Sequence, residues 1–350
     1  MRKNKAIIYG AYGYTGKLIA YEFRKRKIDI VLSGKNEEKL KALSAETGYD
    51  YAVVNIDNHQ KLVEIFSDAI LVINAAGPFI NTCIQLIEAC LQSKTHYIDI
   101  NGDIKVFELI KTFETKAVEA EIMLLPGTGF DIVPTDCLAN KLKKIMPDAT
   151  QLKIAFATIG GGVSHGTAAT VASRLGEKAF KRENGKLIPI PLGKNSMEID
   201  FGLKKMFVMS IPWGDISTAW TSTGIPNIEC FMAVKPKVYK FLKLQFAINW
   251  LLKTNLVKSY IRKIIDKKIT GPDENKRFNS YSLVWAEVKN DKDETKVARL
   301  KTHDGYTLTA IATVTIAEKI FSGNYKKGYQ TPASAYDYNL IEEIEGIEPL

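Results

Sequence analysis

Six short apolar runs alternate with helical patterns over the first 128 residues, and this alternation constrains the fold more than any other feature. The runs are apolar on both faces, as expected for strands that helices cover on both sides of a sheet. Strands that alternate with helices predict a doubly wound parallel sheet. We expect strands at 6–9, 30–33, 52–55, 70–74, 97–100 and 122–125, with helices that include 15–25, 37–46, 83–91 and 105–120.

The rhythm changes after residue 128. Expected strands at 152–159, 282–289, 296–301 and 307–314 predict an antiparallel or mixed sheet, and a helix is expected at 167–180. A polar stretch with Pro and Gly runs from 181 to 212. The fold class is therefore α/β: a Rossmann domain over 1–128 and a second, α+β domain over 129–327. The tail has helical character at 331–345, and we expect 328–350 to pack back on the first domain.

Charge and cysteine content exclude several classes of protein. The net charge is +9, but 235–268 alone contains ten basic residues and one acidic residue, so the rest of the chain is neutral and no nucleic-acid-binding surface is implied. The four cysteines lack the close paired spacing of a zinc site, so we expect no metal and reduced, buried thiols. No signal peptide and no membrane-spanning apolar stretch are visible, which predicts a soluble, cytoplasmic protein.

The basic segment 235–268 carries apolar residues at helical spacing with Lys and Arg between them. One interpretation is an amphipathic helix pair that lies on an anionic membrane surface. The alternative is that the apolar stripe packs on the second domain while the lysines face solvent. A peripheral membrane location is therefore one of two hypotheses.

Three glycines, Gly10, Gly13 and Gly16, follow the first expected strand directly and open a helix. This is the context that a dinucleotide-binding loop requires, because Gly10 allows the turn, Gly13 allows close approach of a pyrophosphate, and Gly16 allows helix–strand packing. Amides at the helix N-terminus then hold the phosphates. The expected contacts also include Tyr12, Tyr14 and Thr15. A glycine-rich turn without a ligand is the alternative.

The choice between NAD and NADP is made where the second strand ends. The sequence there places Ser33, Lys35 and Asn36 before any acidic residue, which favours the 2′-phosphate of NADP over the free ribose hydroxyl of NAD. The alternative for Lys35 is a place on a solvated helix face. Asp57 is a candidate partner of the adenine amino group or, equally, a helix N-cap.

Small residues follow the fourth strand and let a cofactor ribose pass close to the backbone. They are Ala75, Ala76 and Gly77, followed by Pro78 and Phe79. Asn81 or Thr82 is expected to cap the next helix.

Several spaced motifs in this order resemble the saccharopine dehydrogenase-like oxidoreductases, in particular the short branch that includes trans-acting enoyl reductases. The motifs are Gly10–Gly16, Ala76–Phe79, His96–Asp99, Pro126–Asp136, Gly162–Ala168, Gly271–Glu274 and Gly328–Ala333. The resemblance implies an NADP-binding Rossmann domain, a substrate domain and, in some members, a link to lipids. It leaves the substrate open.

A reductase needs a proton donor near the atom that accepts hydride. The segment 127–136 leaves the last Rossmann strand where the nicotinamide is expected, so Asp131 and Asp136 are candidate acids, with Gly129 and Phe130 beside the ring. Alternatively, Asp131 or Thr135 caps a helix that has Pro134 in its first turn. His165, in a glycine-flanked loop, is a further catalytic candidate or a simple loop residue.

The sequence thus predicts an NADP-dependent oxidoreductase that acts on a small-molecule substrate, with lipids among the classes left open, between its two domains. We also expect a homodimer. The alternative is a non-catalytic protein that binds NADP or associates with lipid, because fold alone does not specify function.

Overall fold

The structure is a computed structural model that describes residues 5–173, 178–243, 254, 257, 259, 261, 263–265 and 271–350. The chain divides into two compact units, one formed by Met1–Val133 and Tyr306–Glu345, the other by Pro134–Gly305 and Gly346–Leu350. The first unit thus extends slightly past the expected boundary at 128. The return to it begins at Tyr306 rather than at 328, and the last five residues rejoin the second unit.

The first unit contains a seven-stranded sheet in the order β15-β6-β5-β4-β1-β2-β3. All its strand pairs are parallel. The strands are β1 (Ala6–Tyr9), β2 (Ile30–Gly34), β3 (Tyr51–Val53), β4 (Leu71–Asn74), β5 (His96–Asp99), β6 (Met123–Leu125) and β15 (Gly328–Tyr329). The six strands expected from the sequence are confirmed, and the strand order reverses between β1 and β4, where such sheets bind dinucleotides.

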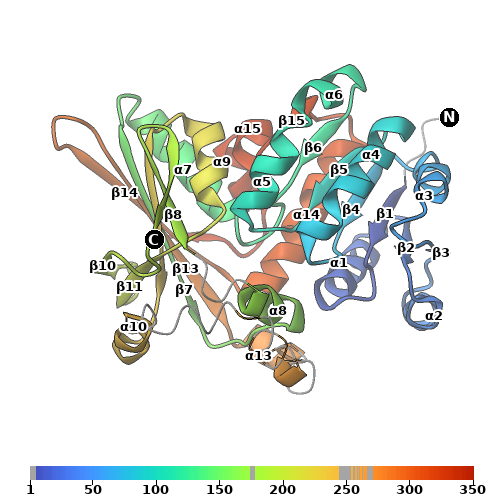
Figure 1. Ribbon diagram of the computed structural model, residues 1–350, viewed down its shortest axis with the longest axis horizontal. Helices are drawn as coiled ribbons and strands as arrows, with labels where there is room; N and C mark the ends of the chain where they lie inside the picture. The colour runs from blue at the N-terminus through green and yellow to red at the C-terminus, as the bar shows by residue number, and fades with distance from the viewer. Residues whose placement is uncertain are drawn as a thin grey trace. The chain divides into compact units, whose positions relative to one another are not determined.

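Helices cover both faces of this sheet. They are α1 (Tyr14–Lys25), α2 (Glu37–Thr47), α3 (His59–Phe66), α4 (Cys83–Ser93), α5 (Ile104–Lys111), α6 (Glu114–Glu119), α14 (Gly305–Phe321) and α15 (Pro332–Tyr336), with 3₁₀ turns η1 (Phe79–Asn81) and η3 (Tyr338–Glu343). Helices α3 to α6 pack on one face through a core that includes Phe66, Leu86 and Val106. On the other side, α14 lies beside α1 (Figure 1), and Arg26 after α1 donates to Thr315 and Glu318 of α14.

Helix α14 corrects one expectation, because 307–314 was expected to be a strand. Every residue from Leu308 to Ala317 is buried, so apolar and small polar residues occur all round this helix and leave no helical periodicity in the sequence. The alternation of Ala and Thr with aliphatic residues in this segment then resembles the alternating pattern of a β-strand.

The second unit is built on a nine-stranded mixed sheet in the order β10-β11-β12-β7-β13-β14-β16, with β8 paired to β12 and β9 paired to β8. Among the strands that the structure describes in this sheet, only β12 and β7 pair in parallel. The strands are β7 (Gln151–Ile159), β8 (Ala179–Glu183), β9 (Lys186–Ile190), β10 (Ser196–Asp200), β11 (Lys205–Ile211), β12 (Asn227–Ala233), β13 (Tyr281–Lys289), β14 (Thr295–His303) and β16 (Glu348–Pro349). The mixed sheet is as expected, and the polar stretch 181–212 contributes β9, β10 and β11 to it.

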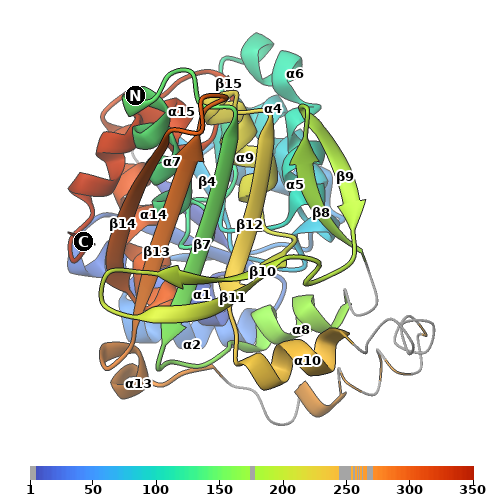
Figure 2. The same cartoon turned by 90° about the vertical axis from the view of Figure 1, so that its left-hand side faces the viewer.

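The β10–β11 hairpin crosses one face of the sheet (Figure 2), and Phe201 and Val208 are buried there with Trp285. Helices α7 (Val133–Ile145) and α9 (Asp215–Thr223) lie on the opposite face. Smaller helices are α8 (His165–Ser173), α10 (Pro236–Lys243) and α13 (Glu274–Phe278). The helix expected at 167–180 is thus wrong at its end, where Phe180 lies in β8.

Most of the basic segment 235–268 lies outside the described residues. Of the part that is described, Ile265 is buried with Ala168 and Ala172 of α8, and Ile261 packs against this cluster. Helix α10 is the longest described piece. Tyr239 is buried against Phe207, with ring centroids 5.1 Å apart, and its hydroxyl accepts a hydrogen bond from Ser196. Lys235, Lys237 and Lys240 are exposed. Helix α10 therefore packs on the second unit through Tyr239 and presents cationic side chains to solvent. In the described part of the chain, no helix has the length and apolar character needed to cross a bilayer.

Candidate functional site

The loop between β1 and α1 brings three glycines together at the centre of the parallel sheet. Gly10 has φ = 83°, and a Cβ there would lie 2.8 Å from the amide nitrogen of Ala76 after β4. A Cβ on Gly16 would lie 2.5 Å from the carbonyl oxygen of Gly10. Only glycine fits at these two positions, so the start of α1 lies directly against the strand ends.

The start of α1 has the properties of a phosphate-binding helix terminus. Gly13 occupies the N-cap position, and within the described part of the chain no side chain caps this helix. A Cβ on Gly13 would meet the Gly10 carbonyl at 3.2 Å, so a larger residue would fill the cradle above the loop. Backbone amides and the positive end of the helix dipole face this cradle, which fits the diphosphate of a dinucleotide. Tyr14, by contrast, packs edge-on against Tyr306, with centroids 4.9 Å apart.

The end of β2 places two lysines near the glycine loop. The Tyr12 ring lies against Gly34, and Lys39 Nζ is 5.7 Å from the centroid of that ring. Lys35, the residue after Gly34, is exposed. Lys39 lies in the first turn of α2, and sequence reasoning missed it because it considered only the strand end. The two ammonium groups fit a 2′-phosphate by charge.

Ser33 and Asn36, both expected to contact the cofactor, have structural roles in this structure, and their contact with a cofactor stays a prediction. Ser33 is fully buried and donates a hydrogen bond to the carbonyl of Ala52 at 3.0 Å, so its hydroxyl belongs to the β2–β3 edge of the sheet. The Asn36 side chain accepts from the Lys39 amide at 2.9 Å and caps α2.

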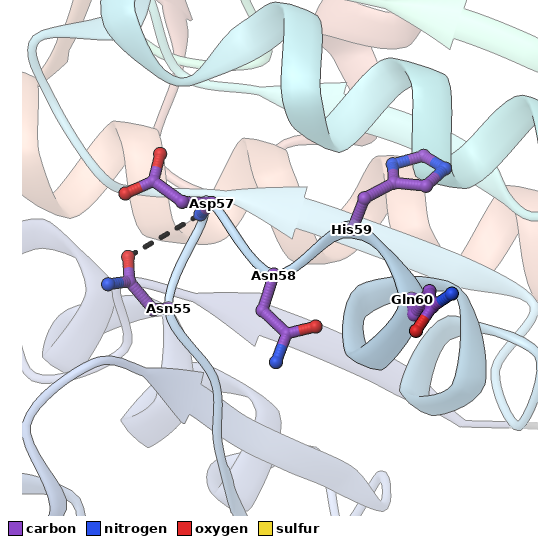
Figure 3. Close-up of a pocket in the computed structure, with 5 residues that line it drawn as sticks. All are labelled: Asn55, Asp57, Asn58, His59 and Gln60. Carbon is purple, nitrogen blue, oxygen red and sulfur yellow. Dashed lines mark hydrogen bonds between the residues drawn. The ribbon is translucent and has the colours of Figure 1, made fainter.

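Asp57 lines an open hollow that follows β3 (Figure 3), together with Asn55, Asn58, His59 and Gln60. Its backbone amide is held by the Asn55 side chain at 3.4 Å, and its own carboxylate is exposed. The N-cap of α3 is Asn58, not Asp57, because Asn58 Oδ1 accepts from the Lys61 amide. Of the two roles expected for Asp57, the cap is therefore wrong, and the adenine contact stays a prediction.

The turn after β4 is fixed by side chains rather than by a helix cap. Asn74 Oδ1 accepts from the Ala76 amide at 3.0 Å, and the Thr82 hydroxyl donates to the Ala76 carbonyl at 2.8 Å. Thr82 does occupy the N-cap position of α4, but without a side-chain cap bond, because its hydroxyl serves this turn. Ala75 and Ala76 are half-buried, Gly77 and Pro78 are exposed, and Phe79 packs on the core.

A buried carboxylate, Asp99, stands at the end of the neighbouring strand β5. It accepts hydrogen bonds from the Asn101 amide (3.0 Å) and side chain (2.6 Å), from the Gly127 amide (3.0 Å) and from the Tyr97 hydroxyl (2.9 Å). Burial raises the pKa of Asp99, and these hydrogen bonds oppose that shift. Sequence reasoning did not identify this group as functional.

The segment after β6 is held by α14. Thr309 of α14 accepts a hydrogen bond from the Phe130 amide at 3.0 Å, and a Cβ on Gly129 would lie 2.8 Å from its hydroxyl oxygen. Thr313 lies 3.0 Å from the Thr128 hydroxyl. Phe130 is buried. These threonines escaped notice because their segment was expected to form a strand.

Asp131 is the half-buried carboxylate of this segment, and its side chain lies against Gly102. Helix α7 begins at Val133 with Pro134 in its first turn. Both roles of Asp131, as a helix cap and as an acid, stay predictions.

The other two catalytic candidates lie in the second unit. Asp136 is fully buried and accepts a hydrogen bond from the Ser222 hydroxyl at 2.5 Å, so it supports the packing of α7 on α9, and its role as an acid stays a prediction. His165 is half-buried and is the first residue of α8 rather than part of a loop.

The four cysteines are free and buried, as expected.

Comparison with known proteins agrees with this geometry. Residues 6–125 match the family model of the saccharopine dehydrogenase NADP-binding domain. The chain is similar to the saccharopine dehydrogenase-like oxidoreductases. It is 25% identical over 221 residues to the rat protein of that name, an alignment that covers 55% of this chain and 51% of the relative. The chain thus spans about half the length of the curated relatives it matches.

Two further relatives bear on chemistry and location. The trans-acting enoyl reductase of Mycobacterium ulcerans is 26% identical over 149 residues, covering 40% of this chain and 36% of the relative. A lipid droplet localized protein of Caenorhabditis elegans is 27% identical over 158 residues, which cover 41% of this chain and 37% of the relative. Among solved structures, apo saccharopine dehydrogenase (L-Glu forming) from Saccharomyces cerevisiae has a TM-score of 0.68 at 11% identity, covering 99% of this chain and 100% of that one. This likeness confirms the α/β fold, and the family resemblance seen in the motifs is confirmed.

Proposed function

We propose that the protein is an NADP-dependent oxidoreductase that transfers hydride between NADPH and a lipid-type substrate. The observation that carries the proposal is the glycine cradle at the start of α1, in a domain that matches an NADP-binding family over residues 6–125. The names of the relatives support the reaction class, and those that refer to enoyl reduction and lipid droplets support the lipid-type substrate.

Different residues of the first unit bind different parts of the cofactor. Amides at the start of α1 hold the diphosphate, while Lys35 and Lys39 meet the 2′-phosphate. The small residues after β4 allow the nicotinamide ribose to approach the backbone. NADPH supplies the hydride, and the Asp131 carboxyl holds the proton that the reduced substrate takes up.

Cofactor binding gives the first test. NADPH fluorescence titration should show binding by the wild type and a loss of at least about tenfold in affinity for Gly13→Ala, because the new methyl group fills the cradle. Gly162→Ala is the control, since its Cβ would make only an ordinary contact of 3.5 Å with Pro272 in the second unit. A wild type that does not bind NADPH would rule the proposal out.

Turnover gives the second test. NADPH consumption is followed with a panel of medium- and long-chain 2-enoyl thioesters, aldehydes and ketones. We expect oxidation of NADPH with at least one member of the panel. Tight NADPH binding without turnover on any of them would favour the alternative of a non-catalytic NADP-binding protein.

A second role, attachment to an anionic lipid surface, is favoured by one observation in the second unit. Helix α10 buries Tyr239 and exposes Lys237 and Lys240, and Lys235 just before the helix is exposed as well. Lysines near an anionic surface each contribute about 1 kcal/mol of attraction. This role is compatible with reductase activity on a lipid-type substrate.

A further inference from the structure

The buried polar groups at the carboxyl ends of β4, β5 and β6 form one connected network around Asp99. Tyr97 donates its hydroxyl proton to Asp99 Oδ2 and accepts a hydrogen bond from Asn74 Nδ2 at 3.1 Å. Asn74 in turn holds the amide of Ala76. The turn after β4 is thus connected to Asp99 through two side chains.

The same carboxylate holds the segments that follow β5 and β6. Oδ1 of Asp99 accepts hydrogen bonds from the backbone amides of Asn101 and Gly127. The backbone carbonyl of Asp99 accepts hydrogen bonds from the amide of Thr128 at 2.8 Å and from the Thr128 hydroxyl at 3.0 Å. Asp99 is fully buried, so these interactions are made in a low-dielectric interior, where they are strong and directional. The Asp99 side chain therefore holds the segments after β5 and β6 directly, and it is linked to the turn after β4 through Tyr97 and Asn74.

We propose that Asp99 is a positioning residue that holds the turns after β4, β5 and β6 in the arrangement that receives the nicotinamide half of the cofactor. This inference rests on the proposed function, because it assumes that NADP binds at the glycine cradle. In a sheet of this order the adenosine half lies over the ends of β1 and β2, and the nicotinamide half lies over the ends of β4 to β6. The hydrogen bonds of Asp99 lead, directly or through Tyr97 and Asn74, to the second group of turns, so loss of its carboxylate should affect one half of the cofactor.

The test compares NADP⁺ with 2′,5′-ADP, which contains the adenosine half alone, by isothermal titration. Asp99→Asn keeps the shape of the side chain but removes the charge and leaves the Tyr97 hydroxyl proton without its acceptor. We expect it to weaken NADP⁺ binding roughly tenfold and to leave 2′,5′-ADP binding within about twofold of the wild type. Tyr97→Phe removes only the hydroxyl that links Asp99 to Asn74. It should weaken NADP⁺ binding as well, but by a smaller factor.

Thr95→Val is the matched control at the opposite end of the same strand. The Thr95 hydroxyl is buried and donates to the Phe66 carbonyl at 2.9 Å, so its loss should lower stability without changing the ratio of the two affinities. In the ligand-free protein, the Gly127 and Asn101 amides should exchange with deuterium faster in Asp99→Asn than in Thr95→Val, because their acceptor is weakened. This second readout needs no cofactor.

The outcomes separate the two claims. If the wild type binds neither ligand, the proposed function falls and this inference falls with it. If the wild type binds both, but Asp99→Asn and Tyr97→Phe each weaken both ligands equally or neither, Asp99 is only a structural group and the inference alone is overturned.

Discussion

The side chain of Asp131 occupies the space that a side chain on Gly102 would need. A Cβ built on Gly102 would lie 3.0 Å from both Cβ and Cγ of Asp131, closer than unstrained side chains approach. Gly102 follows Asn101, which Asp99 holds, and Asp131 follows the segment that Thr309 holds. The position of the candidate acid is therefore determined by a glycine that neither charge nor hydrogen bonding would single out.

Gly102→Ala should displace the Asp131 carboxylate and lower turnover with little change in NADPH affinity. A displacement of about 1 Å can reduce turnover on the order of 100-fold, and overpacking costs about 1–3 kcal/mol of stability. Steady-state kinetics with the best acceptor of the panel, NADPH titration and thermal melting measure the three effects. Asp131→Asn should reduce turnover similarly, and the double variant should add little. Normal turnover in Asp131→Asn would show that another group supplies the proton.

We expect the preference for NADP over NAD to depend on Lys35 and Lys39. A charge-assisted hydrogen bond to the 2′-phosphate is worth roughly 1.5–3 kcal/mol, or about ten- to hundredfold in affinity. A lysine cannot make a bidentate contact with the phosphate, so we expect each of the two lysines to contribute an affinity gain in the lower half of this range. Lys35→Ala and Lys39→Ala should each weaken NADPH while leaving NADH unchanged, and Lys35→Asp should reverse the preference. Titrations at one fixed salt concentration measure this.

Lys41→Ala is the control for these variants. Lys41 is exposed on α2, but two positions after Lys39 it lies on a different face of the helix. It should change neither affinity. Equal binding of NADPH and NADH by the wild type would show that Lys35 and Lys39 serve only as a solvated helix face.

The strands of the first unit and the glycine loop between β1 and α1 were predictable because the sequence patterns that specify them are local. Ile7 and Ile8 belong to a buried run that ends at a glycine, and such runs specify a covered parallel strand without knowledge of the rest of the fold. The β8–β9 hairpin carried an equally local signal that the prediction overlooked. Asn184 and Gly185 both have positive φ between Glu183 and Lys186, which pair across the turn, as the Asn-Gly sequence indicates.

The parts of the candidate site that escaped prediction depend on contacts between distant segments. Thr309 contacts Phe130 across 179 positions of the chain, and nothing near Thr309 indicates that pairing. Ser33 has the residue type of a phosphate ligand, yet its orientation toward Ala52 is set by the pairing of β2 with β3. Residue type and strand position were thus predictable here, but the direction of each side chain was not.

Burial of Asp99 predicts an unusual dependence of stability on pH. Burial raises its pKa above the ordinary value of 3.8, so the folded chain holds this proton more tightly than the unfolded chain. The contribution of Asp99 to the free energy of unfolding is therefore complete below pH 3.8 and declines as the pH rises through the folded-state pKa. Denaturant unfolding of wild type and Asp99→Asn from about pH 4 to about pH 7 measures it.

The difference in unfolding free energy, wild type minus Asp99→Asn, should shrink as the pH rises over this window. Thr95→Val has no titrating group at the altered position, so its difference from the wild type should stay level. A difference for Asp99→Asn that grows with pH would mean that the hydrogen bonds from Asn101, Gly127 and Tyr97 outweigh burial.

Helix α10 allows the membrane hypothesis to be tested without disturbing the cofactor site. Changing Lys235, Lys237 and Lys240 to Glu reverses three exposed charges and leaves Tyr239, which anchors the helix on Phe207, in place. At about 1 kcal/mol per cation near an anionic surface, the triple variant should lose most of its binding to anionic vesicles. Sedimentation with phosphatidylserine-containing and with pure phosphatidylcholine vesicles, at low and at high salt, measures the effect.

We expect the wild type to sediment with the anionic vesicles alone and to be released by salt, because screening shortens the range of the attraction. Lys292→Glu is the matched control, an exposed lysine in the turn between β13 and β14 of the same unit. It should bind as the wild type does. Equal binding of the wild type to both kinds of vesicle, or to neither, would contradict the hypothesis and favour the alternative in which the segment packs on its own domain.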